Sequence, residues 1–337
     1  MALAALCCVS TCMPGQDDLT RDYDGKGKPG ASVLVLHDGE IVFRRSYGLA
    51  DLESGLPSTP STHYRLASVS KQFTAAAVMT LADRGKLSYD DPVRKVLPSL
   101  PAWADQVTVR HLLTHTSGIV DYEDLLAEGA SARLQDADVL RLLEGQTGFY
   151  FPAGAGYRYS NSGYALLALV VERVSGLPFA DFLRQEIFSP LGMKTTVAHV
   201  EGVSTVPDRA YGYSREGAQW KRTDQSVTST VLGDGGIYSS IDELTPWLIA
   251  LDRGRYAMSS EPMVATDSPG VRYGFGWRSG EHGGRRVVSH TGETIGFRNA
   301  IVRFPDQRLS VVVLTNRSEG EPYQAALTIA DRFFAGK

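Results

Sequence analysis

Apolar residues along this chain form strand-like runs near both ends and helical periodicity in the middle. "ASVLVL" from Ala31 to Leu36 is a continuous apolar run, and "IVFRRSYG" follows it after Asp38-Gly39. An Asp-Gly pair between two such runs predicts a two-residue β-hairpin. Near the C-terminus, "RRVVSH", "GFRNAIVRF" and "LSVVVLTN" have the composition of three more strands. The segment "PYQAALTIADRFF" then predicts a closing amphipathic helix.

The middle of the chain predicts helices with irregular connections. "TVRHLLTH", "DADVLRLLEG" and "GYALLALVVERVSG" have helical spacing, and "SSIDEL" has the spacing of a capping box at Ser240 and Glu243. We therefore predict an α+β fold, in which an antiparallel five-stranded sheet is built from both termini and flanked by helices. A single domain over 29–337 would consist of an α/β lobe (about 29–85 and 231–337) and an inserted, mostly helical lobe (about 86–230).

Composition narrows the classes of function. The chain has 337 residues and a net charge of -4, so it lacks the basic surface that nucleic-acid or anionic-lipid binding would need. Its three cysteines, Cys7, Cys8 and Cys12, all precede the predicted domain. The domain therefore has no thiol nucleophile, no disulfide and no cysteine metal site.

The first residues, "MALAALCCVSTCMPG", are apolar for about 13 positions and then reach Pro14-Gly15. This stretch is too short to span a bilayer, and it lacks the basic start of a secretory signal. We interpret 1–14 as a truncated export signal, which predicts an exported, periplasmic or secreted protein with no transmembrane segment. A lipoprotein anchor at Cys12 and a cytoplasmic protein with a frayed terminus are the alternatives. The cysteine-free domain fits either compartment.

A lysine lies one turn into a helix that otherwise looks buried. In "HYRLASVSKQFTAAAVMTLADRGKL" the helix is rich in alanine and ends near Gly85. Ser68 and Lys71 are three residues apart, so their side chains share one helix face. The unpaired N–H groups at a helix start favour negative charge, and a serine beside a lysine is a candidate nucleophile. For Lys71 to accept a proton near neutral pH, its pKa must fall by about 3 units, or ~4 kcal/mol.

Two further segments carry candidate chemistry. In "YRYSNSGY", Tyr159 and Asn161 alternate, so both would point the same way from an extended segment. A phenol beside a lysine can transfer protons, although a loop tyrosine that only packs the core is the alternative. In "VVSHTGETIGF", the edge-strand sequence His290-Thr291-Gly292 offers a glycine that lets a ligand approach the backbone closely. His290 would titrate near neutral pH.

Taken together and in this order, the three segments resemble the serine β-lactamase and penicillin-binding protein superfamily. The nearest variants are the class C β-lactamases, the related D-alanyl-D-alanine carboxypeptidases and the family VIII carboxylesterases. "TVRHLLTHTSGI", "FSPLGM", "GDGGIYSS" and "VVVLTN" also look like recurring segments of this superfamily, and the resemblance runs from about Pro29 to the C-terminus.

The resemblance implies a role for each residue. Ser68 would be the acylated nucleophile, and Lys71 would take its proton, with Tyr159 as partner or alternative base. Asn161 would bind both the substrate carbonyl and the lysine. No metal or cofactor is expected. His111 and His115 lie four apart on a predicted helix, but no acidic residue completes a H-E-x-x-H pattern; we predict that they make hydrogen bonds under the active-site helix.

The third segment implies the substrate-side strand, formed by His290, Thr291 and Gly292. The backbone N–H groups of Ser68 and Glu293 would form an oxyanion hole, each donor worth about 3 kcal/mol in the transition state. Most β-lactamases have lysine where this chain has His290, and a histidine is largely neutral above about pH 6.5. This departure favours an esterase or a D-amino-acid peptidase over an efficient β-lactamase.

We therefore predict a serine hydrolase that acts on small esters, amides or D-amino-acid-containing peptides through an acyl-enzyme. A weak or narrow β-lactamase, a non-catalytic binder of cell-wall peptides on the same fold and a metallohydrolase are the alternatives. The sequence makes no prediction of oligomeric state. The superfamily also has a full helix before its first strand, where "QDDLTRDYDGKGKPG" predicts a missing or shortened one.

Overall fold

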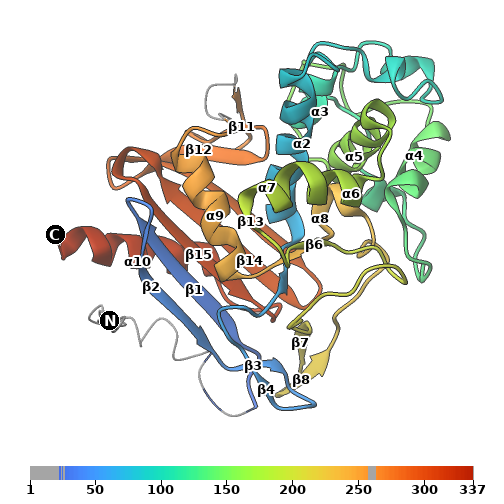
Figure 1. Ribbon diagram of the computed structural model, residues 1–337. Coiled ribbons are helices and arrows are strands. Elements are labelled where there is room, and N and C mark those ends of the chain that lie inside the picture. The colour runs from blue at the N-terminus through green and yellow to red at the C-terminus, as the bar shows by residue number, and fades with distance from the viewer. Residues whose placement is uncertain (1–22, 24, 26, 257–262, 337) are drawn as a thin grey trace, which may run out of the picture.

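The computed structural model of this protein describes Tyr23, Gly25, residues 27–256 and residues 263–336. Its main element is one antiparallel sheet, with strand order β10-β11-β12-β13-β14-β15-β1-β2 (Figure 1). These strands are β1 (Ala31–His37), β2 (Glu40–Tyr47), β10 (Val264–Ala265), β11 (Arg272–Gly274), β12 (Trp277–His282), β13 (Arg285–Thr294), β14 (Phe297–Phe304) and β15 (Leu309–Thr315).

The sheet has eight strands, so the predicted number of five is wrong. The five predicted runs form β1, β2, β13, β14 and β15, and the additional strands β10, β11 and β12 extend the sheet beyond β13. Their sequences, such as "RYG" and "WRSGEH", are short, polar and interrupted by glycine. They have no alternating apolar pattern that would mark them as strands.

The first and the last strand in the sequence are paired inside the sheet, as predicted. β1 pairs with β15 along its whole length, from Ala31 opposite Thr315 to His37 opposite Leu309. The turn between β1 and β2 is also the predicted hairpin, because Asp38 and Gly39 both have positive φ (53° and 80°). Two positive φ values are the signature of the tight turns that suit the twist of paired strands.

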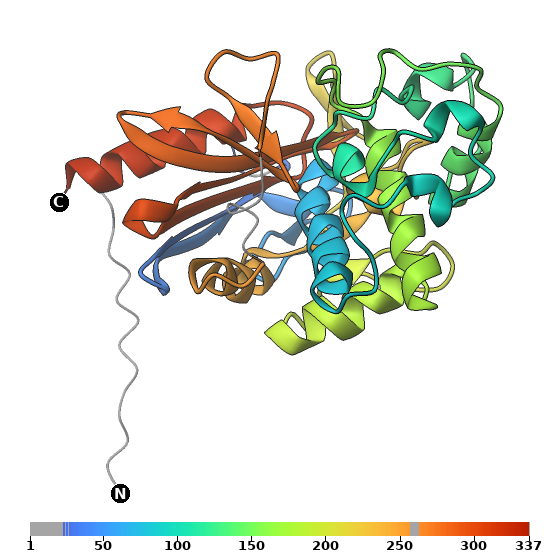
Figure 2. The ribbon, with the colours of Figure 1, turned by 90° about the horizontal axis from the view of Figure 1, so that it is seen from above.

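Helices cover both faces of the sheet (Figure 2). The closing helix α10 (Pro322–Ala335) lies on one face, and α2 (Lys71–Asp83) and α9 (Ile241–Asp252) lie on the other. In β1, Leu34 and Leu36 belong to the core cluster on the α2 and α9 side, whereas Val33 and Val35 belong to the cluster under α10. A strand buried on both faces explains the continuous apolar run in its sequence.

The remaining elements lie mainly between residues 86 and 240. The other α-helices are α3 (Val109–Leu113), α4 (Asp136–Glu144), α5 (Asn161–Ser175), α6 (Phe179–Leu183), α7 (Ser189–Leu191) and α8 (Leu232–Gly235). The single-turn helices are η1 (Ala67–Ser70), η2 (Val93–Lys95), η3 (Ala102–Ala104), η4 (Tyr122–Leu125) and η7 (Pro305–Gln307), and η5 (Arg184–Phe188) is a π-helix. The short strands are β3 (Leu49–Asp51) with β4 (Leu56–Pro57), β5 (Tyr64–Arg65) with β9 (Ile237–Ser239) and β6 (Val197–Ala198), and β7 (Tyr213–Glu216) with β8 (Gln219–Arg222).

Two local expectations need correction. His115 does not lie on a helix with His111, because α3 ends at Leu113 and His115 has φ of 58°. Ser240 caps α9 by accepting the Glu243 N–H, but the Glu243 carboxylate binds the N–H groups of residues 195 and 196 instead of completing the capping box.

Within the described residues, no helix combines the length and the apolar character needed to cross a membrane. The predictions for 1–14 and for the helix before the first strand concern segments that lie mostly outside the described residues.

Candidate active site

One hydroxyl is accessible in an otherwise buried stretch of chain. From Thr62 to Met79, every residue is buried except Ser68. Ser68 lies in the turn η1, which continues directly into α2. The preceding residue, Ala67, has φ of 50°, a left-handed conformation that costs a non-glycine residue about 1–2 kcal/mol. The surrounding fold therefore holds this turn in a strained conformation that exposes the serine.

Lys71 is fully buried, yet its ammonium group has a complete set of acceptors. Nζ lies 3.0 Å from Ser68 Oγ, 2.7 Å from Asn161 Oδ1 and 2.9 Å from the backbone oxygen of Asp234. An ammonium group has three donors and no acceptor, so these contacts satisfy all of its hydrogen-bonding capacity. The buried lysine therefore binds the hydroxyl of Ser68, as their spacing predicted.

Tyr159 and Asn161 meet the lysine from the start of α5. Ser160 between them is extended (φ -140°, ψ 123°) and caps the helix. Asn161 is fixed at the first helical position, where its N–H donates to Asp121 Oδ2 at 2.5 Å. The centre of the Tyr159 ring lies 5.0 Å from Lys71 Nζ. The structure thus brings both predicted residues to Lys71.

His290 lies next to this group but is held inside the protein. Its Nδ1–H donates to the backbone oxygen of Thr291 at 2.6 Å, and its Nε2 accepts the hydroxyl of Tyr273 at 3.1 Å. Burial and the positive charge of Lys71 lower the pKa of His290 to about 3. The expectation that His290 titrates near neutral pH is therefore wrong: the imidazole stays neutral, and protein groups occupy both of its nitrogens.

Gly292 brings the backbone of β13 against the nucleophile turn. A Cβ atom at this position would lie 2.1 Å from the backbone oxygen of Leu66 and 3.1 Å from the backbone nitrogen of Val69. Such contacts are impossible, so this close approach requires glycine. Glu293, the next residue, lines the cleft around Ser68, whereas Thr291 lines a different hollow beside α10.

The cleft around Ser68 is small, with a volume of about 40 Å³, and has a polar lining. It is lined by Arg65, Ala67, Ser68, Tyr122, Glu123, Asn161, Thr228, Asp234, Gly235, Glu293 and Thr294. Three of these side chains are acidic and one is basic. The Lys71 ammonium also lies beside Ser68, and Arg298 pairs with Glu293 at 3.5 Å, so the cleft contains charges of both signs.

Two of these acids have raised pKa values. Burial raises the pKa of Asp234 to about 6 against the opposing charge of Lys71, and the hydroxyl of Tyr122 donates to Asp234 Oδ2 at 2.9 Å. Desolvation and the neighbouring Asp234 raise the pKa of Glu123 to about 7. More than a third of the Glu123 surface remains open to solvent, so its carboxylate is available to a ligand.

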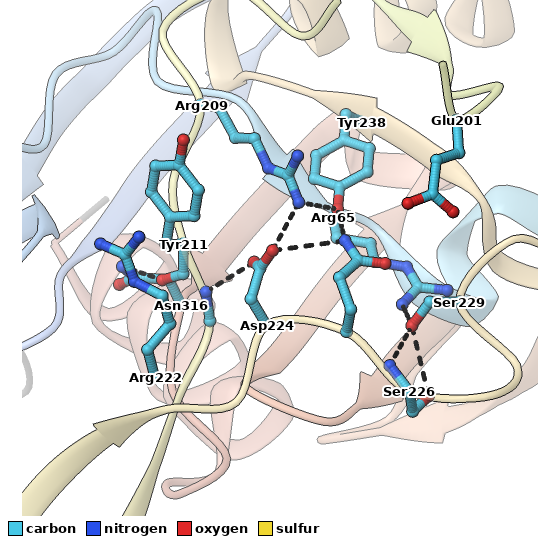
Figure 3. Close-up of polar contacts among 12 residues, drawn as sticks. Arg65, Glu201, Arg209, Tyr211, Arg222, Asp224, Ser226, Ser229, Tyr238 and Asn316 are labelled. Atoms are coloured by element: carbon cyan, nitrogen blue, oxygen red, sulfur yellow. Dashed lines mark hydrogen bonds and ion pairs between the residues drawn. The ribbon is translucent and has the colours of Figure 1, made fainter. Parts of the chain in front are cut away.

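Arg65 is the basic group of the cleft and belongs to a larger polar network (Figure 3). Its buried guanidinium donates to Ser229 Oγ. Nearby, Arg209 binds Asp224 at 2.5 Å and the hydroxyl of Tyr238 at 3.1 Å. These contacts tie residues 224–229 to β5 and β9, and so support the loop that leads into α8 and Asp234.

Sequence reasoning did not assign Arg65, Tyr122, Glu123 or Asp234 to the site. Asp234 lies in "GDGGIYSS", whose recurrence in the superfamily assigns it no role, and "SGIVDYEDL" has no distinguishing pattern. In the described residues, no cluster of three or more His, Cys, Asp or Glu side chains could hold a metal ion.

Comparison with known proteins shows the family of this chain. The family model described as Beta-lactamase matches residues 17–335, which is nearly the whole chain. The chain belongs to the β-lactamase family. It is 33% identical over 333 residues to penicillin-binding protein 4* of Bacillus subtilis (strain 168), covering 91% of this chain and 72% of that protein.

A second relative, a D-aminopeptidase of Gluconobacter oxydans (strain 621H), is 30% identical over 90% of this chain. The chain spans only 58% of that enzyme's length. The crystal structure of a penicillin-binding protein from Bacillus halodurans superposes with a TM-score of 0.81 at 29% identity, over 94% of this chain and 98% of that one. These comparisons confirm the predicted family, the predicted fold apart from its strand number, and the predicted hydrolase class.

Proposed function

We propose that this β-lactamase-family protein is a serine hydrolase that forms an acyl-enzyme on Ser68. The observation that carries the proposal is the contact of an accessible hydroxyl with a buried, fully hydrogen-bonded ammonium group, at 3.0 Å. Lys71 Nζ also donates hydrogen bonds to Asn161 Oδ1 and to the backbone oxygen of Asp234. Its position therefore does not depend on the substrate. A retired site has no physical reason to keep a buried lysine aimed at an exposed serine.

In the proposed reaction, Ser68 Oγ attacks the substrate carbonyl carbon, and its proton passes to the Tyr159 oxygen while the Tyr159 hydroxyl gives its own proton to the leaving group. Lys71 lies 3.0 Å from Ser68 Oγ and stabilises the negative charge that develops on this oxygen during the attack. The backbone N–H groups of Ser68 and Glu293 hold the oxyanion. The leaving amine or alcohol takes the proton from Tyr159, and water then hydrolyses the acyl-enzyme by the same route.

The substrate is proposed to be a small amide, peptide or ester of a D-amino acid with a free α-amino group. Glu123 lies on the cleft with Ser68, and its carboxylate can pair with an ammonium group next to the scissile carbonyl. The D-aminopeptidase relative supports this substrate class. A β-lactam carries a carboxylate instead, which the Glu123 carboxylate would repel.

A substrate panel tests the proposal. D- and L-alanine p-nitroanilide, their N-acetyl derivatives, a p-nitrophenyl ester, a D-Ala-D-Ala peptide and nitrocefin are incubated with wild type and with Ser68→Ala. We expect turnover of the free-amine D-substrate by wild type only, and labelling of Ser68 by a fluorophosphonate. Equal turnover by Ser68→Ala overturns the mechanism. Preference for the N-acetyl derivatives or for nitrocefin overturns the substrate class alone.

A further inference from the structure

His115 contacts the chain on both sides of Tyr159. The N–H of Arg158 donates to the backbone oxygen of His115 at 3.0 Å, and the N–H of Ser160 donates to His115 Nδ1 at 3.1 Å. The imidazole also packs on the Tyr159 ring, with ring centroids 4.3 Å apart. One residue therefore holds the backbone before and after Tyr159 as well as the tyrosine ring itself.

These contacts define where the phenol lies. Among the described residues, the Tyr159 hydroxyl makes no hydrogen bond, so its own oxygen does not fix the side chain. The other aromatic neighbours are farther away, with the Tyr273 and His290 ring centroids at 6.0 and 6.3 Å. The Lys71 ammonium and the Arg278 guanidinium also face the Tyr159 ring, at 5.0 and 5.6 Å from its centre. His115 has the nearest ring, and among these groups it alone binds the backbone on both sides of Tyr159.

The structure keeps His115 in a costly state to make these contacts. Since Nδ1 accepts the Ser160 N–H, the proton of the neutral ring lies on Nε2, which is buried and has no hydrogen-bond partner. The backbone has φ of 58°, a left-handed conformation that is uncommon for any residue other than glycine. Burial lowers the pKa of His115 well below its usual value, and the positive charges of Lys71 and Arg278 lower it further. The ring is thus neutral, with a fixed tautomer.

We infer that His115 is a positioning residue for Tyr159, which sets the distance of the phenol from Ser68 mainly through the Nδ1 acceptor that holds the Ser160 N–H. This role rests on the proposed function, because it requires that Tyr159 exchange a proton with Ser68. It differs from a general packing role, since only a side chain that keeps the acceptor at the Nδ1 position should preserve the rate.

Two substitutions of His115 separate the acceptor from the ring. His115→Asn places an amide oxygen near the Nδ1 position, and asparagine tolerates positive φ. His115→Phe keeps a ring but cannot accept the Ser160 N–H. Because a displacement of ~1 Å at a catalytic group can cost ~10²-fold, we expect His115→Phe to lower kcat by ~10- to 100-fold with KM within about twofold. We expect His115→Asn to keep kcat within about fivefold of wild type.

His111→Phe is the matched control. His111 Nδ1 also accepts a backbone N–H, from Thr108 at 3.2 Å, but it has no contact with Tyr159 in the contacts described above. We expect its kcat and KM to stay within about twofold of wild type. If His115→Phe does not fold by circular dichroism, His115→Gln, whose amide lies beyond the Nδ1 position, replaces it in every comparison.

A double-mutant cycle decides whether His115 acts through Tyr159. In a Tyr159→Phe background, His115→Phe should cause no further loss of kcat, because the proton-transfer group is already absent. An additional loss of the same size in that background overturns the inference, as does a His115→Asn enzyme as slow as His115→Phe or a His115→Phe enzyme with wild-type kcat. The proposed function fails separately, if Ser68→Ala or Tyr159→Phe retains full turnover.

Discussion

Replacing Gly292 with alanine tests whether the backbone of β13 must touch the nucleophile turn. The added Cβ would lie 2.1 Å from the backbone oxygen of Leu66 and 3.1 Å from the backbone nitrogen of Val69. Carbon and oxygen atoms in close contact lie about 3.3 Å apart, so β13 and η1 must separate by roughly 1 Å. Both obstructing atoms belong to the backbone, and no flexible side chain can move aside instead.

The size of the expected loss follows from that displacement. Gly292 precedes Glu293, a proposed oxyanion donor, and Leu66 lies two residues before Ser68. Moving these groups apart by ~1 Å should cost ~10²-fold in kcat/KM, which corresponds to ~2.7 kcal/mol of transition-state stabilisation. Overpacking should also lower the free energy of unfolding by about 1–3 kcal/mol.

The assay is hydrolysis of the best substrate of the panel, together with the rate of fluorophosphonate labelling and a urea unfolding curve. Gly280→Ala is the control, because Gly280 lies on the neighbouring strand β12 and its added Cβ would meet the backbone oxygen of Gly270 at an ordinary 3.7 Å. We expect this control to keep kcat/KM within about twofold. A folded Gly292→Ala enzyme with kcat/KM within about threefold of wild type would refute the reasoning.

Three further predictions follow from charged groups. Glu123→Gln should lower kcat/KM about tenfold for free-amine substrates but leave kcat/KM for N-acetyl substrates unchanged. Because the Glu123 carboxylate is charged only above its pKa of about 7, the wild-type kcat/KM for free-amine substrates should rise through pH 7. Kinetics from pH 5 to 9 should show this rise for wild type and not for the variant. His290 has a folded pKa of about 3, below the unfolded value of 6.5, so between these pH values the unfolded chain binds one more proton than the folded chain. The free energy of unfolding should therefore be greatest above pH 6.5 and fall by roughly 4 kcal/mol towards pH 3. Urea unfolding at several pH values should show a smaller pH dependence of this free energy for His290→Gln than for wild type. Asp252→Ala should lower the free energy of unfolding by about 3–5 kcal/mol, because it removes the counter-ion of the buried Arg303, which pairs with Asp252 at 2.5 Å. In the same urea assay, the double variant Asp252→Ala/Arg303→Met should recover part of this loss. An Asp252→Ala variant as stable as wild type would contradict the reasoning.

Features that depend on neighbours in the sequence could be predicted from the sequence. The apolar runs of β1 and β15 and the Asp38-Gly39 hairpin follow from local composition and backbone preference. The contact of Ser68 with Lys71 follows from three-residue spacing at a helix start. The polar strands β10 to β12 lack any such local pattern, and their pairing with β13 depends on the rest of the sheet.

The family and the order of its motifs were therefore determined by the sequence alone, because they consist of short segments that keep their spacing. Only the tertiary structure decided which other groups reach those segments. Asp234 lies 163 residues from Lys71 and yet accepts one of its hydrogen bonds, and His115 lies 44 residues before Tyr159 and yet packs on its ring. Such contacts leave no periodicity in the sequence, because they form when helices and strands from distant parts of the chain pack around one cleft.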